Sequence, residues 1–141
     1  MSVESFDEVV ETFSFLDEWE ERYRYVIELG REMPPMPEEL KTPGTKVDGC
    51  TSQVWISPRI EGEGPERRLY FVADSDAMIV RGLVALLWLM LNGRSPAEIL
   101  ERDVEKELVD LGLDQHLSAQ RSNGLRAMVA RLKDLARAAA V

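Results

Sequence analysis

The nine residues Leu83–Leu91 form the longest uninterrupted apolar run of the chain. The run is too short to cross a bilayer, which takes about 20 helical residues. It is also too apolar for a surface helix, so it predicts a core helix that is covered on nearly all sides. We expect Asp74 or Ser75 to cap the start of this helix, with Asp76 near the positive end of its dipole. Asn92-Gly93 should stop it.

Gly82 lies inside this predicted helix, where glycine costs on the order of 1 kcal/mol relative to alanine. The residue therefore predicts that another element approaches the helix closely at this point. The chain has 141 residues, 45% of them hydrophobic, which is enough to close one core. We predict a single domain over residues 1–141, with residues 1–12 as a loosely attached N-terminal segment.

Capping residues, helix-breaking residues and the spacing of apolar side chains predict the other helices. Residues 4–11 are expected to form a short helix, and Ser14–Asp17 to begin a second one that ends at Gly30. Ser95-Pro96-Ala97-Glu98 has the pattern of a capping box with proline at the first helical position. Weaker helical spacing follows from Asp103 to Leu111. A C-terminal helix shows apolar residues every three or four positions, and its start is open between two serines: Ser118 and Ser122.

Aromatic and branched residues predict strands at 54–56 and 69–72, joined by the glycine-containing turn 61–66 into an antiparallel hairpin. Residues 34–45 contain four of the seven prolines and predict an extended connector with at most one helical turn. Thr45–Val47 is expected to add a third strand. The predicted fold class is α+β, with a small three-stranded antiparallel sheet packed against several helices.

The charge distribution limits the partners of the protein. The formal net charge is −9, which argues against nucleic acid or an anionic membrane as the main partner, because both require a cationic surface. Residues 1–50 carry 13 acidic and 5 basic residues, whereas residues 115–141 carry 1 acidic and 5 basic. One cysteine and no apolar leader after a basic start are typical of a protein kept in a reducing compartment, and we expect the cytoplasm.

Cys50 is the only cysteine, and turn-forming residues surround it in Val47-Asp48-Gly49-Cys50-Thr51-Ser52-Gln53. Aspartate, glycine, serine and threonine compete for backbone hydrogen bonds, so the segment predicts a loop at the turn between the first two strands. An isolated free cysteine is most often a small buried hydrophobic residue. The polar loop favours a chemical use of the thiol instead.

Four local patterns together resemble the SufE family of sulfur acceptor proteins, which includes the related CsdE proteins. They are 47–55 (VDGCTSQVW), 73–83 (ADSDAMIVRGL), 93–99 (GRSPAEI) and 117–125 (LSAQRSNGL). The resemblance covers the chain from about Phe13 to Ala138, in the order and spacing of the family. Ala119 departs from the proline that many members carry, which should soften the start of the last helix without affecting the chemistry.

The resemblance implies a SufE/NifU-like fold and a sulfur carrier whose catalytic residue is Cys50. Such a protein takes persulfide sulfur from a cysteine desulfurase of the SufS or CsdA type, stimulates that enzyme and passes sulfur to an iron–sulfur scaffold complex. The attacking species is a thiolate, so Cys50 must ionise and be reachable. The resemblance also implies that the thiol rests against an apolar cavity, where burial raises its pKa.

Further residues are predicted to bind the partner or to support the cysteine loop. Asp74 is the leading interface candidate, and Arg121 is a cation in a position that is unfavourable for a helix dipole, where it could steady a thiolate or persulfide. The remaining candidates are Gly49, Thr51, Ser52, Gln53, Ser75, Asp76, Ser122 and Asn123.

Two other classes of function stay open. Cys50, His116 and Asn123 have the residue types of a cysteine-nucleophile hydrolase. Alternatively, the chain is an interaction domain without chemistry, whose acidic N-terminal half binds a basic partner. His116→Ala would abolish a hydrolase and spare a sulfur acceptor, whereas Cys50→Ser would spare an interaction domain.

The inventory of ligands argues against a resident metal or cofactor. A thiolate scaffold needs several cysteines, and structural zinc needs four Cys or His ligands where the chain offers two. No phosphate-binding pattern opens a helix. Four lysines are present, but nothing around them indicates pyridoxal phosphate, so that cofactor is expected on the desulfurase.

Overall fold

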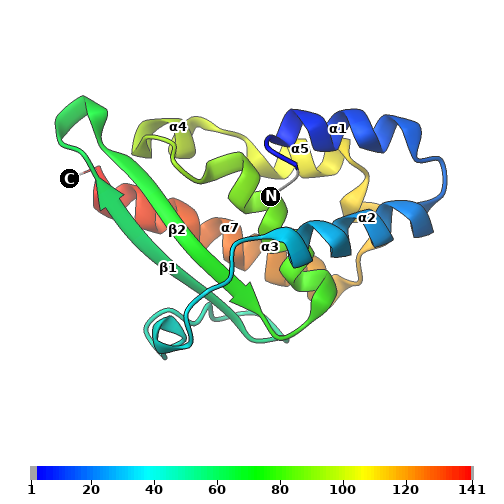
Figure 1. Ribbon diagram of the computed structural model, residues 1–141, viewed down its shortest axis with the longest axis horizontal. Helices are drawn as coiled ribbons and strands as arrows, with labels where there is room; N and C mark the ends of the chain where they lie inside the picture. The colour runs from blue at the N-terminus through cyan, green and yellow to red at the C-terminus, as the bar shows by residue number, and fades with distance from the viewer. Residues whose placement is uncertain (1–2, 141) are drawn as a thin grey trace.

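The computed structural model describes residues 3–140 as one β-hairpin packed on one side against several helices (Figure 1). The strands are β1 (Val54–Glu61) and β2 (Arg68–Ser75), and two single 3-10 turns, η1 and η2, cover Glu38–Leu40 and Gly64–Glu66. The helices are α1 (Phe6–Phe15), α2 (Trp19–Glu32), α3 (Met78–Leu91), α4 (Pro96–Glu101), α5 (Val104–Asp110), α6 (Leu113–His116) and α7 (Ala119–Ala139).

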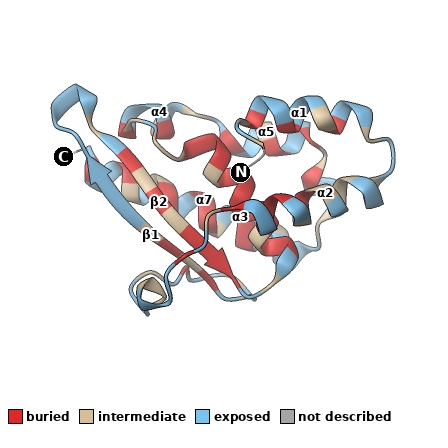
Figure 2. Ribbon diagram, viewed as in Figure 1, coloured by how far each residue is buried: buried red, intermediate tan, exposed pale blue. Residues whose placement is uncertain are grey.

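Helix α3 is the centre of the core, as its composition predicts. Eleven of its fourteen residues are buried, and Figure 2 shows it as an almost continuous red ribbon between the hairpin and α2. One core cluster includes side chains from both strands and from α1, α2, α3, α4, α5, α6 and α7, consistent with a single α+β domain. Among residues 3–140, no helix is long and apolar enough to cross a membrane.

The predicted start of this core helix was wrong by about three residues. Asp74 and Ser75 still belong to β2, because Ser75 pairs with Val54 and Asp74 with Trp55 in the antiparallel register. The helix begins at Met78, and its N-cap residue is Ala77, which supplies no side-chain cap. Strand pairing therefore extends β2 to Ser75, beyond the predicted strand at 69–72. Asp74 lies at the end of this strand and does not cap a helix.

The hairpin is confirmed, but the third strand was wrong. Thr45–Val47 forms a single bridge, between Lys46 and Trp55, with Val47 N donating to Val54 O and Ile56 N donating to Thr45 O. The segment cannot extend this pairing, because the chain turns at Thr42–Thr45 before it and at Gly49 after it. The sheet has two strands within the described residues.

The outer edge of β2 is closed by the end of α3 and the residues that follow it. Phe71 N donates to Asn92 Oδ1 at 2.8 Å, and Trp88 Nε1 donates to Phe71 O at 3.0 Å. Leu69 then exchanges two backbone hydrogen bonds with residues 93 and 94. These contacts satisfy backbone groups that an edge strand would otherwise leave open to pairing with another chain.

Helices α2 and α3 cross with their backbones in contact at two glycines. A Cβ on Gly82 would lie 2.3 Å from Val26 O, and a Cβ on Gly30 would lie 2.7 Å from Gly82 N. The close approach predicted from Gly82 is confirmed, and α2 supplies the neighbouring backbone. Gly30 does not end its helix as expected, since α2 continues to Glu32.

The N-terminal helices differ in detail from the prediction. The first helix extends to Phe15, so Ser14 lies in its last turn, and the second helix begins at Trp19. Phe6 and Val9 are buried in the common core, so residues 6–12 are packed against the domain and are not a loose segment. Periodicity did not show this, because α1 buries only a narrow stripe of its surface.

The capping predictions for the C-terminal half are confirmed. Ser95 and Glu98 form the reciprocal capping box of α4, and the glutamate hydrogen bonds lower its pKa. Of the two possible starts of the last helix, Ser118 is the N-cap, accepting from Arg121 N at 3.2 Å. Asn123 and Gly124 consequently lie inside α7.

Gly82→Ala should destabilise the fold, because the new methyl group would overlap the carbonyl oxygen of Val26. Overpacking of this kind costs about 1–3 kcal/mol. Gly44→Ala is the control: a Cβ there would only touch the Thr42 hydroxyl at 3.7 Å. Urea unfolding followed by circular dichroism should show a lower midpoint for Gly82→Ala and a nearly unchanged one for Gly44→Ala. Equal midpoints for the two variants would contradict the crossing.

Candidate functional site

Cys50 lies in a short loop, residues 48–53, that the hydrogen bonds of the Lys46–Trp55 bridge close at its base. Gly49 has a φ of +90°, a conformation that favours glycine, and it turns the chain immediately before the thiol. The predicted loop setting of the cysteine is therefore present. Arg131 of α7 donates to Lys46 O at 3.3 Å and to Gly44 O at 2.6 Å, which ties the segment before the loop to this helix.

The loop packs against one face of α7. Cys50 Sγ donates to the backbone carbonyl of Gly124 at 3.5 Å, and a Cβ on Gly124 would lie 3.6 Å from the sulfur. A Cβ on Gly49 would lie 3.3 Å from the Ala127 side chain. The absence of a side chain at Gly124 thus lets the thiol lie close to the helix backbone. Gly124 in α7, like Gly82 in α3, thus permits a close approach by another segment.

A pocket of about 360 Å³ opens beside the thiol. The cysteine loop forms one wall, the first turns of α3 form a second, apolar wall, and the start of α7 forms a third. The lining residues are Cys50, Thr51, Ser52, Val80, Leu83, Ser118, Gln120, Arg121, Gly124 and Met128. Three predicted site residues besides the cysteine, namely Thr51, Ser52 and Arg121, are brought together here.

Burial controls the resting ionisation of the thiol. Cys50 is half-buried, and desolvation raises the pKa of its thiol above the ordinary value. The protonated thiol is therefore favoured at rest, because charge is costly where water is partly excluded. The same partial exposure leaves the sulfur accessible from the pocket.

Arg121 supplies a cation to this pocket. It lies in the first turn of α7, where the helix dipole opposes a positive charge, and its guanidinium Nη1 donates to the Tyr23 hydroxyl of α2 at 2.8 Å. Sequence reasoning missed Tyr23, because 98 residues separate it from Arg121. No local pattern indicates that α2 reaches the start of α7.

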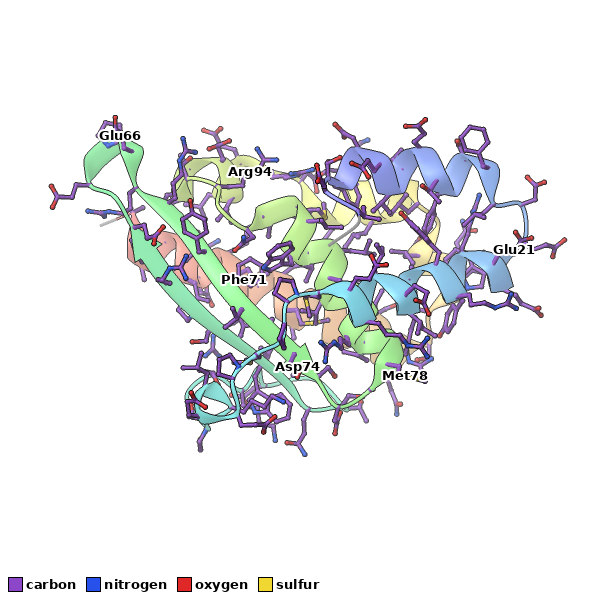
Figure 3. All side chains as sticks on the ribbon, viewed as in Figure 1. Glu21, Glu66, Phe71, Asp74, Met78 and Arg94 are labelled. Atoms are coloured by element: carbon purple, nitrogen blue, oxygen red, sulfur yellow. The ribbon has the colours of Figure 1, made fainter. Side chains whose placement is uncertain are left out.

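Asp74 is buried, with 7% of its surface exposed, and its carboxylate is fully engaged. One oxygen accepts from Arg81 Nη1 at 2.8 Å and the other pairs with Lys41 Nζ at 2.9 Å. Arg81 Nε also donates to Gly30 O at 2.7 Å. Figure 3 shows Asp74 at the end of the hairpin, where the connector from α2 crosses it. The carboxylate joins α2, α3, β2 and the connector and is not presented to the outside.

The residues beside Asp74 support the cysteine loop and its surroundings. Gln53 N, at the exit of the loop, donates to Asp76 Oδ1 at 3.1 Å, and Asp76 N donates back to Gln53 O. Ser75 is buried, and its hydroxyl accepts from Ala77 N just before α3. Asp76 and Gln53 thus anchor one end of the loop to the start of α3.

The remaining candidates lie apart from the thiol. Ser122 lines a separate small cavity between α5, α6 and α7, and exposed Asn123 accepts from Arg126 Nη1 on its own helix. The His116 ring stacks on Trp19 with 4.0 Å between centroids. Among the described residues, the lining of the Cys50 pocket includes none of these three side chains.

Within residues 3–140, no group of three or more His, Cys, Asp or Glu side chains is arranged to hold a metal ion. The polar side chains that line the pocket are the Cys50 thiol, three hydroxyls, the Gln120 amide and the Arg121 guanidinium. The resemblance implied an apolar cavity beside the thiol but did not identify its residues. Val80, Leu83 and Met128 resemble ordinary core residues in the sequence, and only the tertiary arrangement places them in the lining of the Cys50 pocket.

Comparisons with known proteins agree with the resemblance found in the sequence. The family described as "SufE: Fe-S metabolism associated domain" matches residues 7–136. An uncharacterized SufE-like protein of Rhizobium meliloti (strain 1021) is 48% identical over 129 residues, covering 92% of each chain. A second one, of Rhizobium etli, is 47% identical over 133 residues, covering 94% of this chain and 90% of its own.

A solved structure shares the fold. The solution structure of a hypothetical protein from Thermus thermophilus superposes with a TM-score of 0.70 at 28% identity, covering 95% of this chain and 94% of that one. The family match spans nearly the whole chain, including the cysteine loop and the walls of its pocket. The chain therefore belongs to the SufE family, whose domain is associated with iron–sulfur metabolism.

Proposed function

We propose that this protein is a sulfur carrier that accepts sulfane sulfur from a cysteine desulfurase on Cys50 and delivers it for iron–sulfur cluster assembly. The observation that carries the proposal is the lone thiol on a short loop, half-buried beside a pocket with one cation. Membership in the SufE family supports the same role.

The transfer is a thiol–disulfide exchange in its chemistry. The Cys50 thiolate attacks the outer sulfur of a persulfide on the donor cysteine, forming a new S–S bond as the donor's S–S bond breaks. The donor cysteine leaves as a thiolate and takes up a proton, while Cys50 becomes the persulfide. No net oxidation occurs. A second exchange, with an acceptor thiol on the scaffold complex, regenerates the Cys50 thiol.

Activation of the desulfurase follows from this exchange. Removing the outer sulfur frees the donor cysteine for the next turnover. The carrier thereby removes the persulfide that would otherwise block this cysteine. Pyridoxal phosphate belongs to the desulfurase, of the SufS or CsdA type, and we assign no cofactor to this chain. A lone thiol stays free of disulfides in a reducing compartment, where its persulfide must be sheltered from other thiols, and we propose the cytoplasm.

The resting position of the thiol fits this role. The sulfur is hydrogen-bonded to the Gly124 carbonyl, and the apolar residues Val80, Leu83 and Met128 line the pocket beside it. In-line attack on a large donor requires the loop to move away from α7, and the hydrogen bond from Sγ to that carbonyl, at 3.5 Å, comes from a weak thiol donor. Asp76 retains the loop exit during such a movement, and Asp74 acts on a partner through the positions of Lys41 and Arg81.

A hydrolase is less well supported, because its base is missing from the described lining of the pocket. His116 is stacked on Trp19 and lies outside that lining. A general base must lie within hydrogen-bond reach of the nucleophile or one water away. His116 therefore serves better as a packing partner of Trp19.

Incubation with a desulfurase and ³⁴S-labelled cysteine should add one heavy sulfur atom to the protein. Intact mass spectrometry should find the adduct at Cys50, and dithiothreitol should remove it, since a persulfide is reducible. Cys50→Ser should stay unlabelled and should not stimulate the desulfurase. His116→Ala should load like the wild type. Loading of Cys50→Ser, or no loading of the wild type, would contradict the proposal.

Alkylation of Cys50 by iodoacetamide should depend on pH with a midpoint above that of the urea-unfolded protein, because burial raises the thiol pKa in the fold. The folded state then holds the thiol proton more tightly than the unfolded state. The resulting contribution to the free energy of unfolding is fully present below the unfolded pKa and is lost as pH rises through the folded pKa. Cys50→Ser should lack this part of the pH dependence. A folded midpoint at or below the unfolded one would refute the prediction.

A further inference from the structure

We propose that Tyr23 is a positioning residue for Arg121, holding the guanidinium at the Cys50 pocket so that it favours the thiolate and persulfide anions. The inference rests on the proposed function for the role of Arg121. The contacts that support it are present in the protein without a sulfur donor. Tyr23 belongs to α2, whereas the pocket is lined by residues of the cysteine loop, α3 and the segment from Ser118 into α7, and Tyr23 is linked to that lining through Arg121.

The hydrogen bond between these two side chains is well formed. Arg121 Nη1 donates to the Tyr23 hydroxyl at 2.8 Å. This partner is a phenol, although the protein carries 26 acidic residues. A neutral phenol holds the cation without cancelling its charge. An acidic partner in the same place would offset the positive charge of the guanidinium and weaken its effect at the sulfur.

Aromatic packing fixes the phenol in its turn. The Tyr23 ring meets Trp19 edge-on with 6.2 Å between centroids, and Trp19 is stacked on His116 at 4.0 Å. Trp19 also meets the buried Phe13 ring edge-on at 6.5 Å. Edge-to-face and stacked rings at these spacings are favourable and directional. The hydroxyl of Tyr23 is thus attached to the core through three rings.

Arg121 needs such a restraint because of where it lies. It is exposed, it has a long flexible side chain, and the start of α7 repels a cation. Without the phenol, the guanidinium should move out into solvent, where its effect on a thiolate is screened. With the phenol, it stays among the residues that line the pocket of Cys50.

The test is the pH profile of Cys50 alkylation by iodoacetamide in Tyr23→Phe, which removes the hydroxyl and keeps the ring. The midpoint of the profile reports thiol ionisation, and the plateau at high pH reports access to the sulfur. We expect the midpoint to rise by about half a pH unit, so that alkylation near neutral pH slows about threefold, with an unchanged plateau. An unchanged midpoint would overturn the inference.

A double-mutant cycle with Arg121→Ala separates positioning from a general structural effect. Arg121→Ala should raise the midpoint at least as much as Tyr23→Phe, and adding Tyr23→Phe to Arg121→Ala should change nothing further. Tyr25→Phe is the matched control, since Tyr25 belongs to the same helix and packs on Phe13. A full shift in the Arg121→Ala background, or an equal shift in Tyr25→Phe, would refute positioning through Arg121.

The alkylation profile involves no desulfurase, so it can fail independently of the proposed function. With a desulfurase and labelled cysteine, Tyr23→Phe should load sulfur on Cys50 more slowly but to the same extent as the wild type. A wild type that alkylates as expected but never loads would refute the sulfur carrier and leave the Tyr23–Arg121 pairing intact. Equal loading rates together with equal alkylation midpoints would refute the pairing alone.

Discussion

The contact between the backbones of α2 and α3 at Gly30 and Gly82 is the constraint on which the rest of the structure depends. Any side chain at Gly82 would meet the Val26 carbonyl, so the helices can approach this closely only with glycine. The crossing brings the end of α2 to Arg81, which donates to Gly30 O and pairs with Asp74. It also directs the first half of α2 towards the start of α7, where Tyr23 meets Arg121.

The site itself is built from parts that are individually ordinary. A hairpin carries a short loop, one glycine in α7 lets the thiol lie against a helix backbone, and α3 supplies an apolar wall. Burial raises the pKa of Cys50, which keeps a resting thiol protonated, and Arg121 is among the residues that line the same pocket. For the sulfur carrier that we propose, a protonated thiol is unreactive at rest, and the proposed effect of the guanidinium is to favour the anion during transfer.

Acidic residues at the end of β2 illustrate how one motif serves several purposes. Asp74 looked like a surface contact in the sequence, but its carboxylate is buried between Lys41 and Arg81. Asp76, two residues later, is exposed and retains the exit of the cysteine loop through Gln53. The strand ends between these two residues, so residue type alone could not assign their roles.

The sequence by itself determined the elements whose signals are local. The apolar run marked the core helix, the Ser95–Glu98 capping box marked the start of α4, Gly82 marked a close approach, and turn residues marked the loop of Cys50. The tertiary structure alone decided which distant side chains meet. Tyr23 contacts Arg121, which is 98 residues away in the sequence. The predicted strand at Thr45–Val47 forms only one bridge, and Asp74 is buried. Capping, propensity and periodicity act over a few residues, whereas these contacts depend on how whole helices cross and on strand register, which no short segment encodes.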